Sequence, residues 1–212
     1  MTTTVPSASH YVGLRYDTKR RWCSYWHQLD EVLARPPASV LVVGVGSRLV
    51  PDYLRSLGME VTTLDVAGDL APDVLGDVRS IPLEDDAVEL VLCCQVLEHV
   101  PFDDVPTALS ELARVATTRA VISVPRRGRG WELVLRIPPL SRLARHGVLP
   151  SRHPFVFDGE HHWELGTQTT PRRAFVEVFE QHFVVDRSFL VPEHLYHEFF
   201  VARPRQASGS RR

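Results

Sequence analysis

Short apolar runs and amphipathic segments alternate along the chain. Runs rich in β-branched side chains predict strands buried on both faces, and they cover residues 40–43, 61–64, 87–94 and 120–124. Apolar positions at helical spacing predict helices over residues 19–34, 50–56, 105–115 and 172–181. Residues 183–190 and 196–202 predict a closing antiparallel pair of strands. The alternation predicts an α/β fold with a doubly wound, mostly parallel sheet and helices on both of its faces.

A chain of 212 residues is long enough for a substantial core, so residues 1–212 are expected to form a single domain. Its start lacks the features of a signal peptide, and no apolar run is long enough to span a bilayer. Residues 1–15 and 204–212 are expected to be flexible. Residues 126–163 interrupt the alternation and are rich in arginine and proline. We expect them to form an irregular insertion, a lid over the carboxyl ends of the strands, where open α/β sheets bind ligands.

Charge and cysteine content narrow the class of protein. The 24 basic and 26 acidic side chains give a net charge of -2, which argues against a protein that coats nucleic acid. The three cysteines are Cys23, Cys93 and Cys94. Neighbouring residues of a strand point to opposite faces, so a bridge between Cys93 and Cys94 is not expected. An odd count in such a chain indicates reduced thiols and a cytoplasmic protein.

A glycine pair follows the first predicted strand. Gly44 and Gly46 allow a tight turn and a close approach of a ligand to the backbone, although such a pair is also a common turn. Asp65 ends the second predicted strand, where a carboxylate can accept hydrogen bonds from both ribose hydroxyls or simply cap a turn. A dinucleotide fingerprint requires a third glycine at the position of Leu49, so NAD and FAD fit poorly. Together the features predict an adenosine-type cofactor.

Longer stretches carry a family resemblance. They cover residues 38–125 and read VLVVGVGS, TTLDV, GDVRSIPLEDDAVELVLCCQVLEHV, ALSELARVA and AVISVP. In these stretches the chain resembles the class I S-adenosylmethionine-dependent methyltransferases of the type 11 group. The resemblance implies a seven-stranded Rossmann-like sheet with an antiparallel last strand, S-adenosylmethionine as cofactor, and transfer of its methyl group to an acceptor.

The resemblance also implies roles for particular residues. Gly44 and Gly46 would lie against the methionine part of the cofactor, and Asp65, followed by Val66, would hold the ribose. Asp77 would accept a hydrogen bond from the adenine amino group. The residues expected beside the adenine ring are Val78 and Arg79, and those expected to border the sulfonium are Cys94, Gln95 and Leu97. His99 continues this last loop, either as a support or as a catalytic residue.

One position departs from the family's pattern. The third glycine of the first motif usually stands two residues after the second, and Arg48 occupies that position here. Its side chain can crowd the methionine carboxylate, turn outward, or pair with that carboxylate. The first possibility leaves a non-catalytic binding or scaffold module on the same fold as an alternative.

Catalytic candidates come from outside the cofactor core. Methyl transfer to a protic oxygen or nitrogen can need a general base, and histidine is the usual one. His161 and His162 in FDGEHHWELG are the candidates. The alternative is that Trp163 anchors this loop while a histidine caps a turn. Adjacent histidines rarely reach one ion together, so no metal site is expected.

The remaining expectations concern the acceptor. Tyr11 and Tyr16 are candidates for a pocket lid, and helical spacing places Trp22 and Tyr25 in the core. Residues 126–152 hold seven arginines and one acidic residue, Glu132. Such a stretch suits an anionic or lipid-linked substrate, weak contact with a membrane surface, or a solvated lid with an apolar underside. A small-molecule acceptor is the leading expectation, and RNA is not expected.

Overall fold

The structure is a computed structural model that describes residues 8–135 and 143–205. Its main sheet has seven strands in the order β3-β2-β1-β4-β5-β9-β8. The strands are β1 (Ser39–Val43), β2 (Glu60–Asp65), β3 (Val74–Leu75), β4 (Val88–Cys94), β5 (Ala116–Pro125), β8 (Phe183–Val191) and β9 (His194–Pro204). β9 pairs antiparallel with both β5 and β8, and the other pairings are parallel. The predicted doubly wound, mostly parallel sheet is confirmed. The two-residue strand β3 is an addition that the sequence pattern did not predict.

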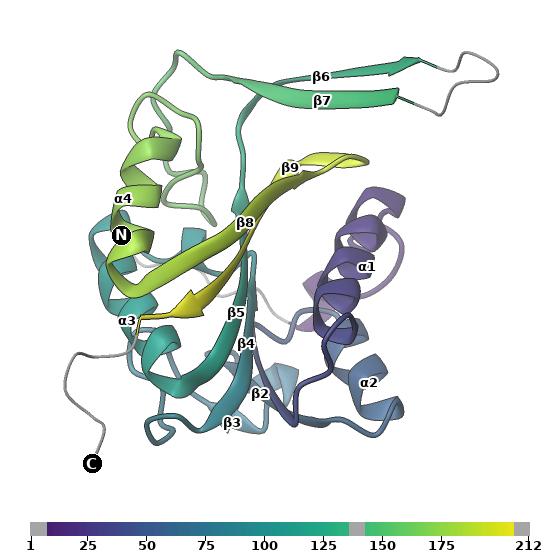
Figure 1. The fold of residues 1–212 in the computed structure, drawn as a ribbon, viewed down its shortest axis with the longest axis vertical. Helices are drawn as coiled ribbons and strands as arrows, with labels where there is room; N and C mark the ends of the chain where they lie inside the picture. The colour runs from purple at the N-terminus through teal and green to yellow at the C-terminus, as the bar shows by residue number, and fades with distance from the viewer. Residues whose placement is uncertain (1–7, 136–142, 206–212) are drawn as a thin grey trace.

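Helices cover both faces of this sheet (Figure 1). α1 (Lys19–Leu33) and α2 (Leu49–Ser56) lie on one face, and α3 (Val105–Val115) and α4 (Arg172–His182) lie on the other. Successive residues of β1 explain why its apolar run is continuous. Val40 and Val42 pack with α1 and α2, whereas Leu41 and Val43 belong to the core beneath α3 and α4.

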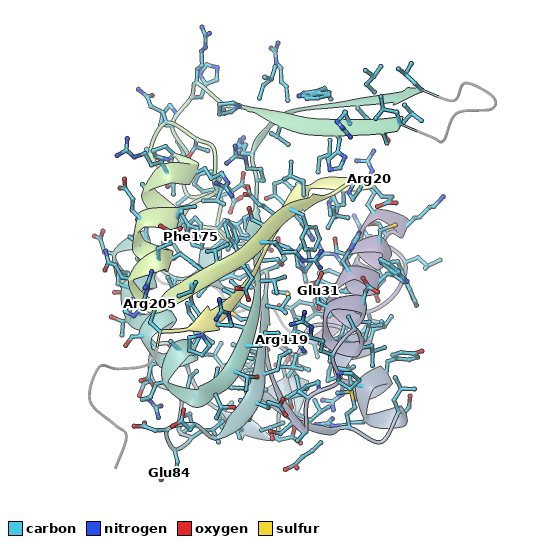
Figure 2. All side chains as sticks on the ribbon, viewed as in Figure 1. Arg20, Glu31, Glu84, Arg119, Phe175 and Arg205 are labelled. Atoms are coloured by element: carbon cyan, nitrogen blue, oxygen red, sulfur yellow. The ribbon has the colours of Figure 1, made fainter. Side chains whose placement is uncertain are left out.

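The core beneath α3 and α4 is rich in phenylalanine. Phe175 of α4 points toward the sheet (Figure 2), and its ring centroid lies 5.4 Å from that of Phe200 on β9. Trp163 is 2% exposed and packs against Phe175 at 5.5 Å. This cluster holds the end of the segment 126–163 against the sheet. The histidines that precede Trp163 are thereby held near the site described below.

The expectation of an irregular insertion was wrong for much of residues 126–163. β6 (Gly128–Leu135) and β7 (Leu143–Pro150) form a separate two-stranded antiparallel sheet. The alternation of Trp131, Leu133 and Leu135 with smaller or polar residues is the strand pattern that the arginines obscured. Residues 151–163 that follow β7 contain no helix or strand.

Other expectations concern the ends and the core. Residues 1–7 and 206–212, parts of the ends expected to be flexible, lie outside the described residues, while Ala8–Tyr11 form a 3₁₀ turn. Trp22 was expected in the core but is 49% exposed, because it lies on the outer side of α1. All three cysteines are free thiols. Within the described residues, no helix is long and apolar enough to cross a bilayer.

Candidate active site

A pocket with a volume of about 560 Å³ lies at the carboxyl ends of β1, β2 and β4. The turn after β1 forms one wall. Gly44 and Gly46 both have positive φ angles, +84° and +52°. A Cβ atom on Gly44 would lie 2.6 Å from Cγ2 of Val96, so this position also excludes a larger side chain on steric grounds.

Most of the predicted site residues meet in this pocket. Its lining includes Gly44, Gly46, Asp65, Val66, Asp77, Val78, Arg79, Cys94, Gln95, His99 and His161. Among the described lining residues, neither Leu97 nor His162 is found. Leu97 was placed beside the sulfonium by resemblance, but it is fully buried in the core beneath α3. The 3₁₀ turn Leu97–His99 directs it inward, away from the pocket.

Asp65 ties the first two strands together at the pocket. Its Oδ2 accepts a hydrogen bond from the amide of Val45 at 2.8 Å, and its Oδ1 accepts one from the amide of Ala67 at 2.9 Å. Each carboxylate oxygen can accept a further hydrogen bond. The turn role and the ribose role proposed from sequence are therefore compatible, because the backbone contacts orient the carboxylate at the pocket wall.

Asp77 and Arg79 form an ion pair on the same side of the pocket. Asp77 Oδ2 lies 2.7 Å from an Arg79 guanidinium nitrogen, and the amide of Arg79 donates to Asp77 Oδ1 at 2.8 Å. Arg79 also contacts Asp104 at 2.6 Å. The hydrogen bond from the Arg79 side chain holds the pKa of Asp77 below its usual value. The carboxylate is thus charged and fixed where the resemblance implies adenine recognition.

The loop after β4 completes this wall. Gln95 has a positive φ of 58°, and its Nε2 donates to Ser123 Oγ at 3.2 Å. Burial raises the pKa of the Cys94 thiol to about 12, so this lining side chain is a neutral thiol at physiological pH. Glu98 follows and is fully buried, and within the described part of the chain neither of its carboxylate oxygens has a hydrogen-bond partner.

Arg48 turns away from the pocket. Its backbone has a left-handed φ of 63°, a conformation that favours glycine. The guanidinium donates to the carbonyl oxygens of Leu70 and Ala71 at 2.9 and 3.1 Å, and lies 3.5 Å from Asp52. Arg48 is absent from the described pocket lining. Of the three orientations considered from sequence, the outward one is observed.

His161 reaches the pocket from the loop that follows β7. The amides of Glu160 and His161 donate to Oδ1 of Asp158, which forms the tight turn that aims the histidine. His161 Nδ1 lies 3.2 Å from Oε1 of Glu164, a residue that is 4% exposed. The hydroxyl of Tyr196 donates to the same oxygen.

The surroundings of His161 set its proton affinity. Burial alone would lower the pKa of the imidazole, but the hydrogen bond to Glu164 and the charges of Glu98 and Asp158 raise the pKa above its usual value. Burial opposes the charge on Glu164, yet the hydrogen bonds from His161 and Tyr196 lower the pKa of its carboxyl. The pair therefore consists of a charged carboxylate and a basic imidazole, an arrangement suited to proton transfer.

His162 points elsewhere. Its amide donates to the carbonyl of Glu98 at 2.8 Å, and its ring packs on Phe157 at 4.7 Å. Trp163 Nε1 donates to the carbonyl of Val100 at 3.1 Å, so the expectation that Trp163 anchors this loop agrees with the structure. Of the two histidines, only His161 is placed where a base would have to lie, and its role stays a prediction.

His99 lies beside His161. Its Nδ1 is 3.1 Å from the carbonyl oxygen of Glu160, and the two histidine rings make an edge contact at 5.0 Å. Donor atoms of Glu98, His99 and His161 lie within 4.8 Å of one another, as do those of Asp158, His161 and Glu164. These groups offer the ligand types that a divalent ion prefers. The expectation from sequence that no metal is held stays a prediction.

Other lining residues come from the N-terminal segment and β9. Tyr11, Tyr16 and Tyr25 line the pocket, as expected for the first two but not for Tyr25. Sequence reasoning missed further lining residues, among them Arg21 on α1 and His194, Tyr196 and His197 on β9. For the three residues of β9, the dense group of aromatic and histidine residues in EHLYHEFF was the available signal.

Comparison with known proteins agrees with this geometry. Residues 41–124 match the family described as "Methyltransferase domain". The match covers less than half of the chain, and over these residues the chain is similar to a methyltransferase domain. Over 92 residues the chain is 37% identical to a ubiquinone biosynthesis O-methyltransferase of Xanthomonas campestris pv. campestris (strain B100), a match that covers 35% of this chain and 38% of the relative. The chain thus matches less than two-fifths of the length of this curated relative.

Solved structures extend the likeness to the whole methyltransferase fold. The PH0226 protein from Pyrococcus horikoshii OT3 has a TM-score of 0.61 at 15% identity, covering 92% of this chain and 95% of that chain. A 1,6-didemethyltoxoflavin-N1-methyltransferase from Burkholderia thailandensis, with bound 1,6-didemethyltoxoflavin and S-adenosylhomocysteine, has a TM-score of 0.59 at 19% identity, covering 94% of this chain and 87% of that chain. At these identities the likeness concerns the fold.

Proposed function

We propose that the protein is an S-adenosylmethionine-dependent methyltransferase that methylates an oxygen or nitrogen of a small molecule. One observation carries the proposal: the strand-end carboxylates Asp65 and Asp77 and the His161–Glu164 pair line or adjoin the same pocket. The first two suit an adenosine group, and the pair suits removal of a proton from an acceptor. The family match over residues 41–124 and the S-adenosylhomocysteine bound in a structural relative support the cofactor.

The residues present fit this cofactor. Asp65 has acceptor capacity left on both oxygens for the ribose hydroxyls, and Asp77 is held charged for the adenine amino group. The glycine turn leaves room for the methionine part, and Arg48 is directed away from it. When bound, S-adenosylmethionine supplies a methyl group on a positively charged sulfur. A nucleophile can take this methyl group, and the sulfur then leaves as the neutral thioether of S-adenosylhomocysteine.

His161 is the proposed general base. Because Glu164 accepts a hydrogen bond from Nδ1–H, the neutral imidazole keeps its lone pair on Nε2. An acceptor O–H or N–H would give its proton to this nitrogen as the acceptor atom takes the methyl group. The resulting imidazolium is stabilised by Glu164, which Tyr196 holds in place. His99 adjoins His161 and is proposed as a support of the loop rather than the base.

The alternatives from sequence now have less support. A non-catalytic module was suggested by Arg48, whose side chain does not enter the described pocket lining. None of the described hairpin residues lines the pocket either, so a lid over the acceptor is proposed only for the loop around Glu160 and His161. We expect a cytoplasmic protein with no nucleic-acid partner, in line with its free thiols and net charge of -2.

The test is a screen for S-adenosylhomocysteine formation with phenols, hydroxy acids and amines as acceptors. His161→Gln is expected to slow turnover of any active acceptor by about 100-fold or more, a typical contribution of a general base. His162→Gln is the matched control, because its ring packs on Phe157 outside the pocket lining, and it should stay within about threefold of the wild type. Equal losses in the two variants would contradict the role of His161.

A further inference from the structure

The hairpin formed by β6 and β7 extends away from the main sheet above β9 (Figure 1). All eight residues of β6 are exposed. An isolated two-stranded hairpin is marginally stable in water, so a long one with apolar side chains requires cover from something else. Its contacts with the body are concentrated near its base, where a Cβ on Gly130 would lie 2.8 Å from Leu195 of β9.

The two faces of the hairpin differ. Directly opposed residues share a face, and Trp131 pairs with Gly147, Leu133 with Arg145, and Leu135 with Leu143. Gly130, on the other face, approaches β9, which makes that face the inner one. The outer face therefore consists of Arg129, Trp131, Leu133, Leu135, Leu143, Arg145, Gly147 and Leu149.

On β7 exposure largely follows the same division, whereas β6 is exposed along its whole length. On the outer face, the large apolar side chains of Trp131, Leu133 and Leu149 are 46%, 51% and 60% exposed. On the inner face of β7, Ala144, His146 and Val148 are half-buried. The protein thus directs its more apolar hairpin face toward solvent, the reverse of what packing onto the body would produce.

The charge of the outer face indicates whether a second copy of the chain or a lipid surface covers it. The described residues of the outer face include two arginines, Arg129 and Arg145, and no acidic residue, while Glu132 lies on the inner face. Two copies of this face in contact would bring arginines of like charge together, which opposes self-association. Leucines and a tryptophan flanked by arginines are the composition that enters the interface of an anionic bilayer.

We propose that the outer face of the β6–β7 hairpin binds the surface of an anionic lipid membrane. The apolar side chains enter the boundary between headgroups and acyl chains, and Arg129 and Arg145 contact lipid phosphates. Leu195, which supports the hairpin, stands between His194 and Tyr196 of the pocket lining. Membrane contact would therefore place the hairpin between the lipid surface and β9, which carries these lining residues. The proposal does not depend on methyl transfer.

The test is co-sedimentation of the full chain with vesicles of phosphatidylcholine alone or with 30% phosphatidylglycerol. The wild type is expected to bind the anionic vesicles at least tenfold more tightly than the neutral ones, and raised salt should weaken this binding. Leu133→Ser together with Trp131→Ser should reduce binding at least tenfold. Val134→Ser, on the inner face of the same strand, is the matched control and should stay within threefold.

A second pair of variants separates charge from apolar contact. Arg129→Gln with Arg145→Gln should remove most of the preference for anionic vesicles, whereas Arg173→Gln with Arg203→Gln, two exposed arginines elsewhere, should not. Circular dichroism of each variant checks that it is folded. Equal binding to neutral and anionic vesicles, no vesicle binding at all, or a dimer by light scattering that the Trp131 and Leu133 changes dissociate would each overturn the proposal.

Discussion

Arg48 allows a test of the turn after β1 that needs no acceptor. The structure places this residue at φ 63°, a conformation that costs an L-residue about 1 kcal/mol and glycine almost nothing. Its guanidinium makes hydrogen bonds to two carbonyls and a 3.5 Å ion pair with Asp52. Because this side chain is partly exposed, we take these contacts to stabilise the fold by about 1–2 kcal/mol in total.

Two substitutions separate strain from contacts. Arg48→Ala removes the contacts and keeps the strained backbone, so it should lower the free energy of unfolding by about 1–2 kcal/mol. Arg48→Gly removes the same contacts but relieves the strain, so it should be about 1 kcal/mol more stable than the alanine variant. Urea denaturation followed by circular dichroism measures both. A difference of this size corresponds to roughly 2–4 °C in Tm for a domain of this length.

A second site provides the control for this comparison. Glu177 is exposed within α4, where alanine is favoured over glycine by about 1 kcal/mol, so the order of the two variants should be reversed there. An alanine variant at residue 48 that is as stable as the glycine variant would refute the strained turn. Cofactor affinity should stay within about threefold in both Arg48 variants. A tenfold gain on Arg48→Gly would mean that the arginine obstructs the site.

Three further predictions concern the site. Once an acceptor is known, turnover should fall as pH drops through the raised pKa of His161, because the protonated imidazole cannot take a proton, so the acidic limb should lie above about 6.5. Glu164→Gln should lower kcat by about 10- to 100-fold and move that limb to lower pH, with an unchanged KM for S-adenosylmethionine; an unmoved limb would refute the pairing. Gly44→Ala should lower Tm by several degrees and weaken cofactor binding, since the added Cβ meets Val96 at 2.6 Å, and a variant that melts like the wild type would contradict that contact.

The parallel part of the fold could be predicted because its signals are local. Strands buried on both faces require continuous apolar runs, and the turn after β1 requires glycine at positive φ. The hairpin was missed because arginines and glycines interrupt its alternating pattern. The two-residue strand β3 forms only because it adjoins β2, a tertiary pairing that no short sequence pattern shows.

The cofactor half of the site was more predictable than the acceptor half. Asp65 ends β2, whose carboxyl end adjoins that of β1, so its place at the pocket follows from the predicted topology. Asp77 follows the unpredicted strand β3, and only the family resemblance indicated its place. His161 and His162 cannot be distinguished in sequence, since the turn made by Asp158 decides which one enters the pocket. The partnership of His161 with Tyr196 on β9 joins residues 35 positions apart, and it depends on how the last strands return to the sheet.

The most direct test of the proposed function is calorimetric titration of the protein with S-adenosylmethionine and S-adenosylhomocysteine. The wild type is expected to bind with a Kd in the micromolar range, and Asp65→Ala should weaken binding by about tenfold or more, or about 1.4 kcal/mol, because the ribose loses a charged acceptor. Asp69→Ala is the matched control, since Asp69 contacts the amide of Ala8 and is outside the described pocket lining. Binding of neither compound at millimolar concentration, or equal affinity in the wild type and Asp65→Ala, would contradict the account.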